Sequence, residues 1–178
     1  MMSFFKISCV VACLAMVLQL GGCATSATSQ AMTVKPAAVA ALNPKLKGAL
    51  RVGEVGGGKD TNPLWTSQVD NAGFKKALMD SLAITGYLAQ DPVQARYSVD
   101  ATLVSLDQPV FGLTYDVKSE VNYKLTGPAR TQSFPVRATG TATTGDAFVG
   151  VERLRIANER SIMENIKEFI QQLVSLVD

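Results

Sequence analysis

The chain has 178 residues, with 17 lysines and arginines against 15 aspartates and glutamates, so its formal net charge is +2. This length suffices for one domain with a hydrophobic core but not for two domains of ordinary size. A near-neutral charge argues against a nucleic-acid partner, and the absence of histidine argues against most zinc sites and the usual catalytic triads. We therefore expect no nucleic acid, no metal and no other cofactor.

The first 22 residues have the pattern of a signal peptide. Lys6 is the one charge in a short leading region, and residues 10–20 are almost wholly apolar. That apolar stretch is too short to span a bilayer whose apolar core is about 30 Å thick. It ends in the four residues Leu20-Gly21-Gly22-Cys23.

This ending resembles the bacterial lipobox, at which a lipoprotein-specific peptidase cleaves before a cysteine that carries acyl chains such as palmitate. The resemblance implies that Cys23 is lipidated and becomes the first residue of the mature chain. Cys9 and Cys13 would then leave with the signal peptide, and no disulfide could form. An ordinary secretory signal with an incidental cysteine is the alternative.

The residue after the cysteine bears on the destination. Inner-membrane retention typically shows aspartate there, whereas this chain has Ala24. The resemblance therefore implies a lipid anchor in the outer membrane of a Gram-negative cell, facing the periplasm. Several acyl chains on one residue supply the multiple-chain anchoring that stable attachment needs.

A linker is expected between the cysteine and the domain. Residues 24–44 are rich in alanine, serine, threonine, glutamine and proline and show no apolar periodicity. A coil of this length has a span of roughly 25 Å, which would let the domain move off the membrane. We divide the chain into a signal peptide (1–22), the lipidated Cys23 with a flexible tether (23–47), and one periplasmic domain (48–178).

The domain is predicted to begin with a strand at 49–55 and a helix. Ser67 is the expected N-cap of that helix, and Gly86 is its expected C-terminal stop. Between them, apolar residues recur at the spacing of one helix face: Phe74, Ala77, Leu78 and Leu82.

Three strands and a long helix follow. Apolar and polar residues alternate at 97–103, 115–126 and 132–143, which indicates an antiparallel sheet with one dry face and one solvated face. A helix at 151–177 has an apolar stripe that includes Phe169 and Leu173, and we expect it to cover the dry face. A coiled-coil partner helix is the alternative. The predicted fold is α+β in two layers, with a mainly antiparallel sheet, two helices on one face and the order β-α-β-β-β-α.

Catalytic chemistry has little support in the sequence. The densest charge cluster has the mixed signs and spacing of surface ion pairs on a helix, and its members are Glu152, Arg153, Arg155, Glu159 and Arg160. Asp146 is expected to cap the last helix, and Trp65 to cover the core. A cleft that gathered Glu152, Glu159 or Asp146 with a perturbed pKa would favour an enzyme.

A partner-binding surface is predicted on the solvated face of the sheet. Lys118, Glu120 and Lys124 project side by side from the strand at 115–126. Such a polar surface of mixed charge suits hydrogen bonds to an envelope protein or a glycan, and not a buried acyl chain, which needs an apolar groove. The alternative is that these side chains are simply solvated.

In element order the whole chain resembles small outer-membrane lipoproteins of the YajG type. It resembles more loosely the LptE-type lipoproteins of lipopolysaccharide assembly and the auxiliary lipoproteins of lipid-transport systems. The residues that carry the resemblance are the motif ending at Cys23, the helix at 74–86, and residues 145–148 before the long last helix. The resemblance implies a non-catalytic binding or accessory module of the cell envelope. The alternative is an envelope hydrolase or transferase of unfamiliar type acting on lipid or glycan.

Overall fold

The computed structural model describes residues 24–36, 42–62 and 66–176. Cys23 and Trp65 lie outside these ranges, so the predictions made for them stay predictions. Within these ranges, no helix combines the length and the apolar character that a membrane crossing requires. The elements, in chain order, are α2 (Ser29–Met32), η3 (Pro44–Leu46), β1 (Leu50–Gly56), α3 (Asn71–Ile84), η4 (Pro92–Gln94), β2 (Tyr97–Asp107), β3 (Tyr115–Thr126), β4 (Thr131–Ala142) and α4 (Gly150–Val174).

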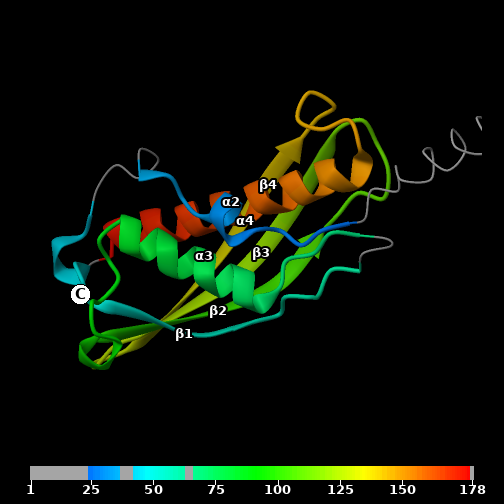
Figure 1. Ribbon diagram of the computed structural model, residues 1–178. Coiled ribbons are helices and arrows are strands. Elements are labelled where there is room, and N and C mark those ends of the chain that lie inside the picture. The colour runs from blue at the N-terminus through cyan, green and yellow to red at the C-terminus, as the bar shows by residue number, and fades with distance from the viewer. Residues whose placement is uncertain (1–23, 37–41, 63–65, 177–178) are drawn as a thin grey trace, which may run out of the picture.

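The four strands form one sheet in the order β1-β2-β3-β4 (Figure 1). β1 pairs with β2 in parallel, across the connection made by α3, and the other two pairings are antiparallel. Both long helices lie on the same face of the sheet, α3 beside β1 and α4 across β3 and β4. The predicted two-layer α+β fold is confirmed, and the parallel pair makes the sheet mixed.

β3 shows how the sequence sets the two faces of the sheet. Its residues are alternately buried and accessible along the whole strand. Val117, Val121 and Tyr123 have no exposed surface, whereas Lys118 and Lys124 are exposed. The predicted dry and solvated faces are therefore both present.

α3 begins later than the sequence pattern suggested. Asp70, and not Ser67, is its N-cap, because the Asp70 carboxylate accepts a hydrogen bond from the Gly73 amide at 2.7 Å. The Ser67 side chain is buried instead. The helix ends at Ile84 with Thr85 as its C-cap, and the predicted stop Gly86 follows with a φ of 80° that is accessible to glycine. The Tyr87 amide donates to the Leu82 carbonyl at 2.8 Å.

α4 is a core helix of this chain, as predicted. Phe169 and Leu173 are fully buried, and the Phe169 ring stacks on Tyr123 with the centroids 4.1 Å apart. The prediction that Asp146 caps this helix is wrong. The N-cap residue is Val149, without a side-chain hydrogen bond, because Asp146 is engaged by Arg160 at 2.6 Å.

The prediction of a flexible tether over 23–47 is corrected for the described part of that range. Met32, Val34 and Leu46 are almost completely buried, and Figure 1 shows the segment with α2 lying across α3 and α4. The Val34 amide donates to Ser81 Oγ on α3 at 3.0 Å. Single apolar residues of short helical turns and extended chain join the core here, and such isolated contacts produce no periodic pattern in the sequence.

Candidate functional site

The three residues predicted to bind a partner lie on the solvated face of β3. Lys118 and Lys124 are exposed, and neither forms an ion pair within the described part of the chain. Glu120 is half-buried and accepts two hydrogen bonds from Arg137 on β4, at 3.0 Å from Nε and 3.1 Å from Nη2. This pairing raises the pKa of Arg137. Two lysines on this face thus remain available to an anionic or hydrogen-bonding partner, and Glu120 is already engaged.

An open groove of about 670 Å³ lies beside Lys124. β1, β2, β3 and the first turns of α3 line it, and its charged lining residues are Glu54, Lys75, Asp100 and Lys124. Lys118 and Glu120 lie outside it. The groove therefore lies at the β1 edge of the sheet, between the solvated face and α3, and its charges of both signs suit a polar ligand better than an acyl chain.

A second concavity lies at the end of the molecule where β3 turns into β4. Its volume is about 360 Å³, and its lining is mostly apolar: Tyr97, Leu125, Gly127, Pro128, Ala129 and Leu176, with Arg130 and Gln132. Cavities of this kind accept small apolar groups. None of the residues singled out in the sequence line it.

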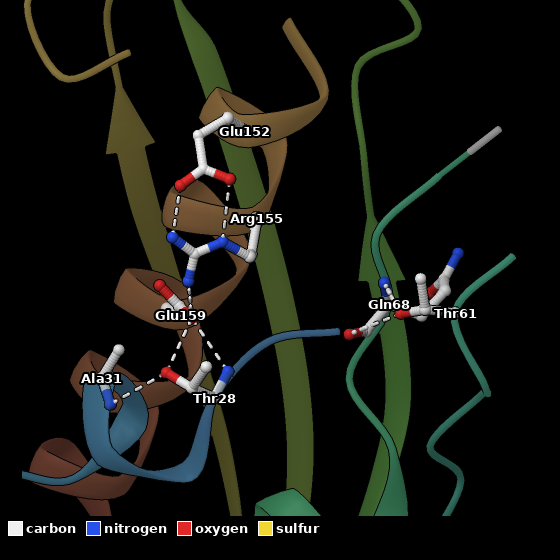
Figure 2. A network of polar contacts seen from close by, with 7 residues as sticks. All are labelled: Thr28, Ala31, Thr61, Gln68, Glu152, Arg155 and Glu159. Atoms are coloured by element: carbon white, nitrogen blue, oxygen red, sulfur yellow. Dashed lines mark hydrogen bonds and ion pairs between the residues drawn. The ribbon is translucent and has the colours of Figure 1, made fainter. Parts of the chain in front are cut away.

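The charge cluster of α4 is only partly a set of surface pairs. Arg155 lies between two carboxylates at the predicted spacing, with its Nε 3.1 Å from Glu152 and its Nη1 2.5 Å from Glu159 (Figure 2). Glu159 is buried, however, and accepts hydrogen bonds from both the amide and the hydroxyl of Thr28, at 2.8 and 3.0 Å. Figure 2 shows Arg155 and Thr28 approaching this carboxylate from opposite sides. The network therefore fastens the N-terminal segment to α4.

Glu152 and Asp146 are held in their ionised form. The hydrogen bond from Arg155 lowers the pKa of Glu152, and Arg160 lowers that of Asp146 well below its ordinary value. Neither group would hold a proton for general-acid chemistry near neutral pH. Glu159 lines a groove of about 430 Å³ between the N-terminal segment and α4, but Glu152 and Asp146 do not line it. Glu152 and Asp146, whose pKa values are lowered, therefore lie outside the groove that contains Glu159.

Arg153, expected on the surface, is buried. Its Nη1 donates to the carbonyls of Ala147 and Phe148 at 3.0 and 2.7 Å, and its Nη2 to that of Gly112 at 3.0 Å. The guanidinium also lies over the Tyr115 ring, 5.2 Å from its centroid. Sequence analysis missed this role because a buried arginine that bonds loop carbonyls leaves no spacing to recognise.

A buried polar layer beneath α4 was also missed. Asn165 accepts from the Tyr123 hydroxyl at 2.9 Å and donates to the Val136 carbonyl at 3.0 Å, and Ser161 bonds Ser119 at 2.9 Å. The signal was present: Asn158, Ser161 and Asn165 recur at the same helical spacing as the apolar stripe. These contacts fix the register of α4 on the sheet.

Within the described ranges, no group of three or more acidic or cysteine side chains could hold a metal ion.

Comparison with known proteins shows the fold and no family. No protein-family model matches this chain, and no curated protein matches it either. An uncharacterised protein of known structure matches with a TM-score of 0.51 and 11% identity, over 75% of this chain and 96% of that chain. At this identity, the likeness shows the fold alone.

Two further solved structures are similar at lower scores. A protein of Caulobacter crescentus, provisionally assigned as a lipoprotein, has a TM-score of 0.42 and 12% identity over 71% of this chain and 86% of its own. A protein of Xanthomonas campestris described by the DUF330 family model has a TM-score of 0.43 and 12% identity, over 84% and 91%. The likeness to the YajG and LptE types stays a prediction.

Proposed function

We propose that this chain is a lipoprotein, anchored to the outer membrane through acyl chains on Cys23, that serves the cell envelope from the periplasmic side as a non-catalytic binding or accessory module. The observation that carries the proposal is the motif Leu20-Gly21-Gly22-Cys23 behind a short apolar stretch. The residues directly after the motif support it, because Ala24 and Ala27 are buried in the folded body. The folded body therefore includes residues that closely follow the cysteine in the sequence.

A binding role fits the side chains better than a catalytic one. Glu152, Glu159 and Asp146 are each paired with an arginine, and the paired arginines lower the pKa values of Glu152 and Asp146. The groove beside Lys124 and the two exposed lysines of β3 offer hydrogen bonds and charge without an activated nucleophile. We assign the partner-binding surface to Lys118 and Lys124, with a protein or glycan of the envelope as partner.

The test of the anchor is metabolic labelling with a clickable fatty acid in a Gram-negative host. Wild type should incorporate the label and sediment with the outer membrane, whereas Cys23→Ala should lose both properties. Cys13→Ala is the matched control, since it removes a thiol from the same leader without touching the motif. Equal labelling of the wild-type protein and Cys23→Ala, or an unlabelled wild-type protein, would overturn the proposal.

A further inference from the structure

Two loops carry most of the exposed large apolar side chains of the described chain. The β2–β3 loop (108–114) presents Val110, Phe111 and Leu113, and the β4–α4 loop (143–149) presents Phe148 and Val149. Their exposed fractions run from 51% for Val149 to 90% for Phe148. We call these five residues the apolar tip. A cluster of this kind is unusual on a solvated monomer and indicates a surface that is covered in use.

One buried side chain joins the two loops. Arg153 donates to the Gly112 carbonyl of the first loop and to the Ala147 and Phe148 carbonyls of the second. These three carbonyls therefore face inward and need no water. Arg153 thus ties the backbones of both loops together, while their apolar side chains are exposed.

The apolar tip carries no unpaired charge. Residues 108–114 contain no ionisable side chain. The one charge in residues 143–149 is Asp146, which is paired with Arg160 and also accepts from the Thr143 amide at 2.8 Å. Since transfer of an unpaired charge out of water makes membrane entry expensive, the absence of such a charge lowers the cost of moving these loops from water to the membrane interface.

The start of the described chain lies at the same end of the molecule as the apolar tip. The Ala27 amide donates to the Gln68 carbonyl at 3.0 Å, and the Gln68 side chain donates to Gln108, two residues before Val110, at 3.3 Å. Figure 1 shows the blue start of the segment and both loops at one end, with η4 and the β3–β4 turn at the other. Lipidated Cys23 would thus hold the apolar tip within reach of a bilayer.

We propose that the apolar tip inserts into the membrane interface beside the acyl chains and fixes the orientation of the domain. This inference rests on the proposed lipid anchor. A lipid surface is the occupant because the anchor keeps it next to the loops permanently, which raises its effective concentration above that of any diffusing partner. The β3–β4 turn then points into the periplasm, and the solvated face of the sheet stands roughly along the membrane normal, open to partners from the side.

The test uses the lipidated chain in vesicles of phosphatidylethanolamine and phosphatidylglycerol. In a mature lipoprotein Cys23 is blocked, so an introduced cysteine is the one free thiol. An environment-sensitive dye on Phe111→Cys should brighten several-fold and be quenched by nitroxide-labelled lipid. Val93→Cys is the matched control, because Val93 is 86% exposed in η4 at the opposite end and should report water.

Three outcomes separate the two proposals. If wild type takes up the thiol dye, Cys23 is free and the anchor itself fails. If wild type is unlabelled but the dye at position 111 reports the same aqueous environment as the dye at position 93, the anchor stands and the proposed membrane insertion of the apolar tip is wrong. If position 111 becomes shielded only when envelope proteins are added, a protein covers the tip and the inference is likewise overturned. Unchanged thermal unfolding of both cysteine variants verifies that each is folded.

Discussion

Glu159 illustrates how one charged side chain fastens the N-terminal segment (24–36) to α4. Its carboxylate is buried and accepts from Thr28 and Arg155, groups that come from the two ends of the described chain. A buried acceptor with three donors is costly to remove, because each donor is then left without its partner.

We therefore expect Glu159→Ala to lower the free energy of unfolding by about 1–3 kcal/mol, since Arg155 keeps Glu152 but the Thr28 donors lose their acceptor. Glu164→Ala is the matched control on the same helix, because Glu164 forms only a partly exposed pair with Lys167 and should cost about 0–1 kcal/mol. Urea unfolding measures both variants. Hydrogen exchange should also accelerate at the amides of residues 24–36 in Glu159→Ala alone, and equal exchange in the two variants would contradict the role of Glu159.

The pairing of Asp146 with Arg160 makes the free energy of unfolding depend on pH in acidic solution. Arg160 lowers its folded-state pKa from the ordinary 3.8, so the stabilisation is complete above that value and is lost as the pH falls towards the folded-state pKa. Arg160→Gln should therefore be less stable than wild type at pH 7, and the gap should narrow below about pH 4. Part of the gap persists at every pH, because Arg160 also donates to the Thr141 carbonyl at 2.6 Å.

Urea midpoints at pH 7, 4 and 3 measure this effect. Lys47→Gln provides the control, since Lys47 is an exposed cation that forms no ion pair within the described part of the chain, and it should leave the acid profile of wild type unchanged. A gap between Arg160→Gln and wild type that stays constant from pH 7 to pH 3 would refute the electrostatic origin.

Single residues also mark the limit of sequence analysis. Phe169 and Leu173 were predicted as core because they repeat at helical spacing, and both are fully buried. Arg153 and Glu159 were assigned to the surface because charged residues are rarely buried. Most of the groups that bond these two buried side chains lie more than five positions away in the sequence, and Thr28 lies 131 positions from Glu159. A rule based on local spacing cannot detect such partners.

Among the elements, the crossing of α4 over β4 depends on Gly140, a residue that has no side chain. A Cβ built on Gly140 would lie 2.1 Å from the Ser161 amide nitrogen and 2.3 Å from the Ala157 carbonyl oxygen. Both are backbone atoms of α4 and cannot rotate away. The glycine thus lets the helix approach the strand closely enough for Ser161 and Asn165 to reach the sheet.

We expect Gly140→Ala to cost about 1–3 kcal/mol in the free energy of unfolding, because the helix must move outward. Gly56→Ala is the control in another strand, since its Cβ would meet nothing within 4 Å, and it should be neutral or slightly stabilising. Thermal unfolding of the two variants provides the comparison. A Gly140→Ala protein as stable as Gly56→Ala would show that α4 can shift without loss.

The helices and strands themselves were predicted more reliably than their ends and their pairing in the sheet. Strands β3 and β4 and the core face of α4 follow from strict period-two and helical patterns. The start of α3 was misplaced because Ser67 and Asp70 are both acceptable N-caps, and the buried contacts of Ser67 decide against it. The parallel β1–β2 pair depends on where α3 packs, which no local pattern encodes.

For the whole molecule, the solvated face is the surface on which a partner is expected. Lys118→Glu with Lys124→Glu reverses two exposed charges without touching the core, so the fold should persist. If this face binds an envelope partner, in-cell cross-linking of the double variant should lose the partner band. Lys45→Glu with Lys47→Glu, which makes the same change of net charge near η3, should retain it. Partner bands that are identical in both double variants would leave this face as a solvated surface.

The attachment of the N-terminal segment to α4 also sets an order of events in biosynthesis. Thr28 bonds Glu159, and Asn43 bonds the Leu173 carbonyl, 131 and 130 positions later in the chain. The α4 side of the surface that receives the N-terminal segment is absent until the last helix has been synthesised, and contacts of such long sequence separation form late and slowly. The beginning of a growing chain therefore has α3, but not α4, to pack against. For a chain that is exported, as we propose for this one, late completion of the fold suits passage of an unfolded polypeptide through a narrow channel.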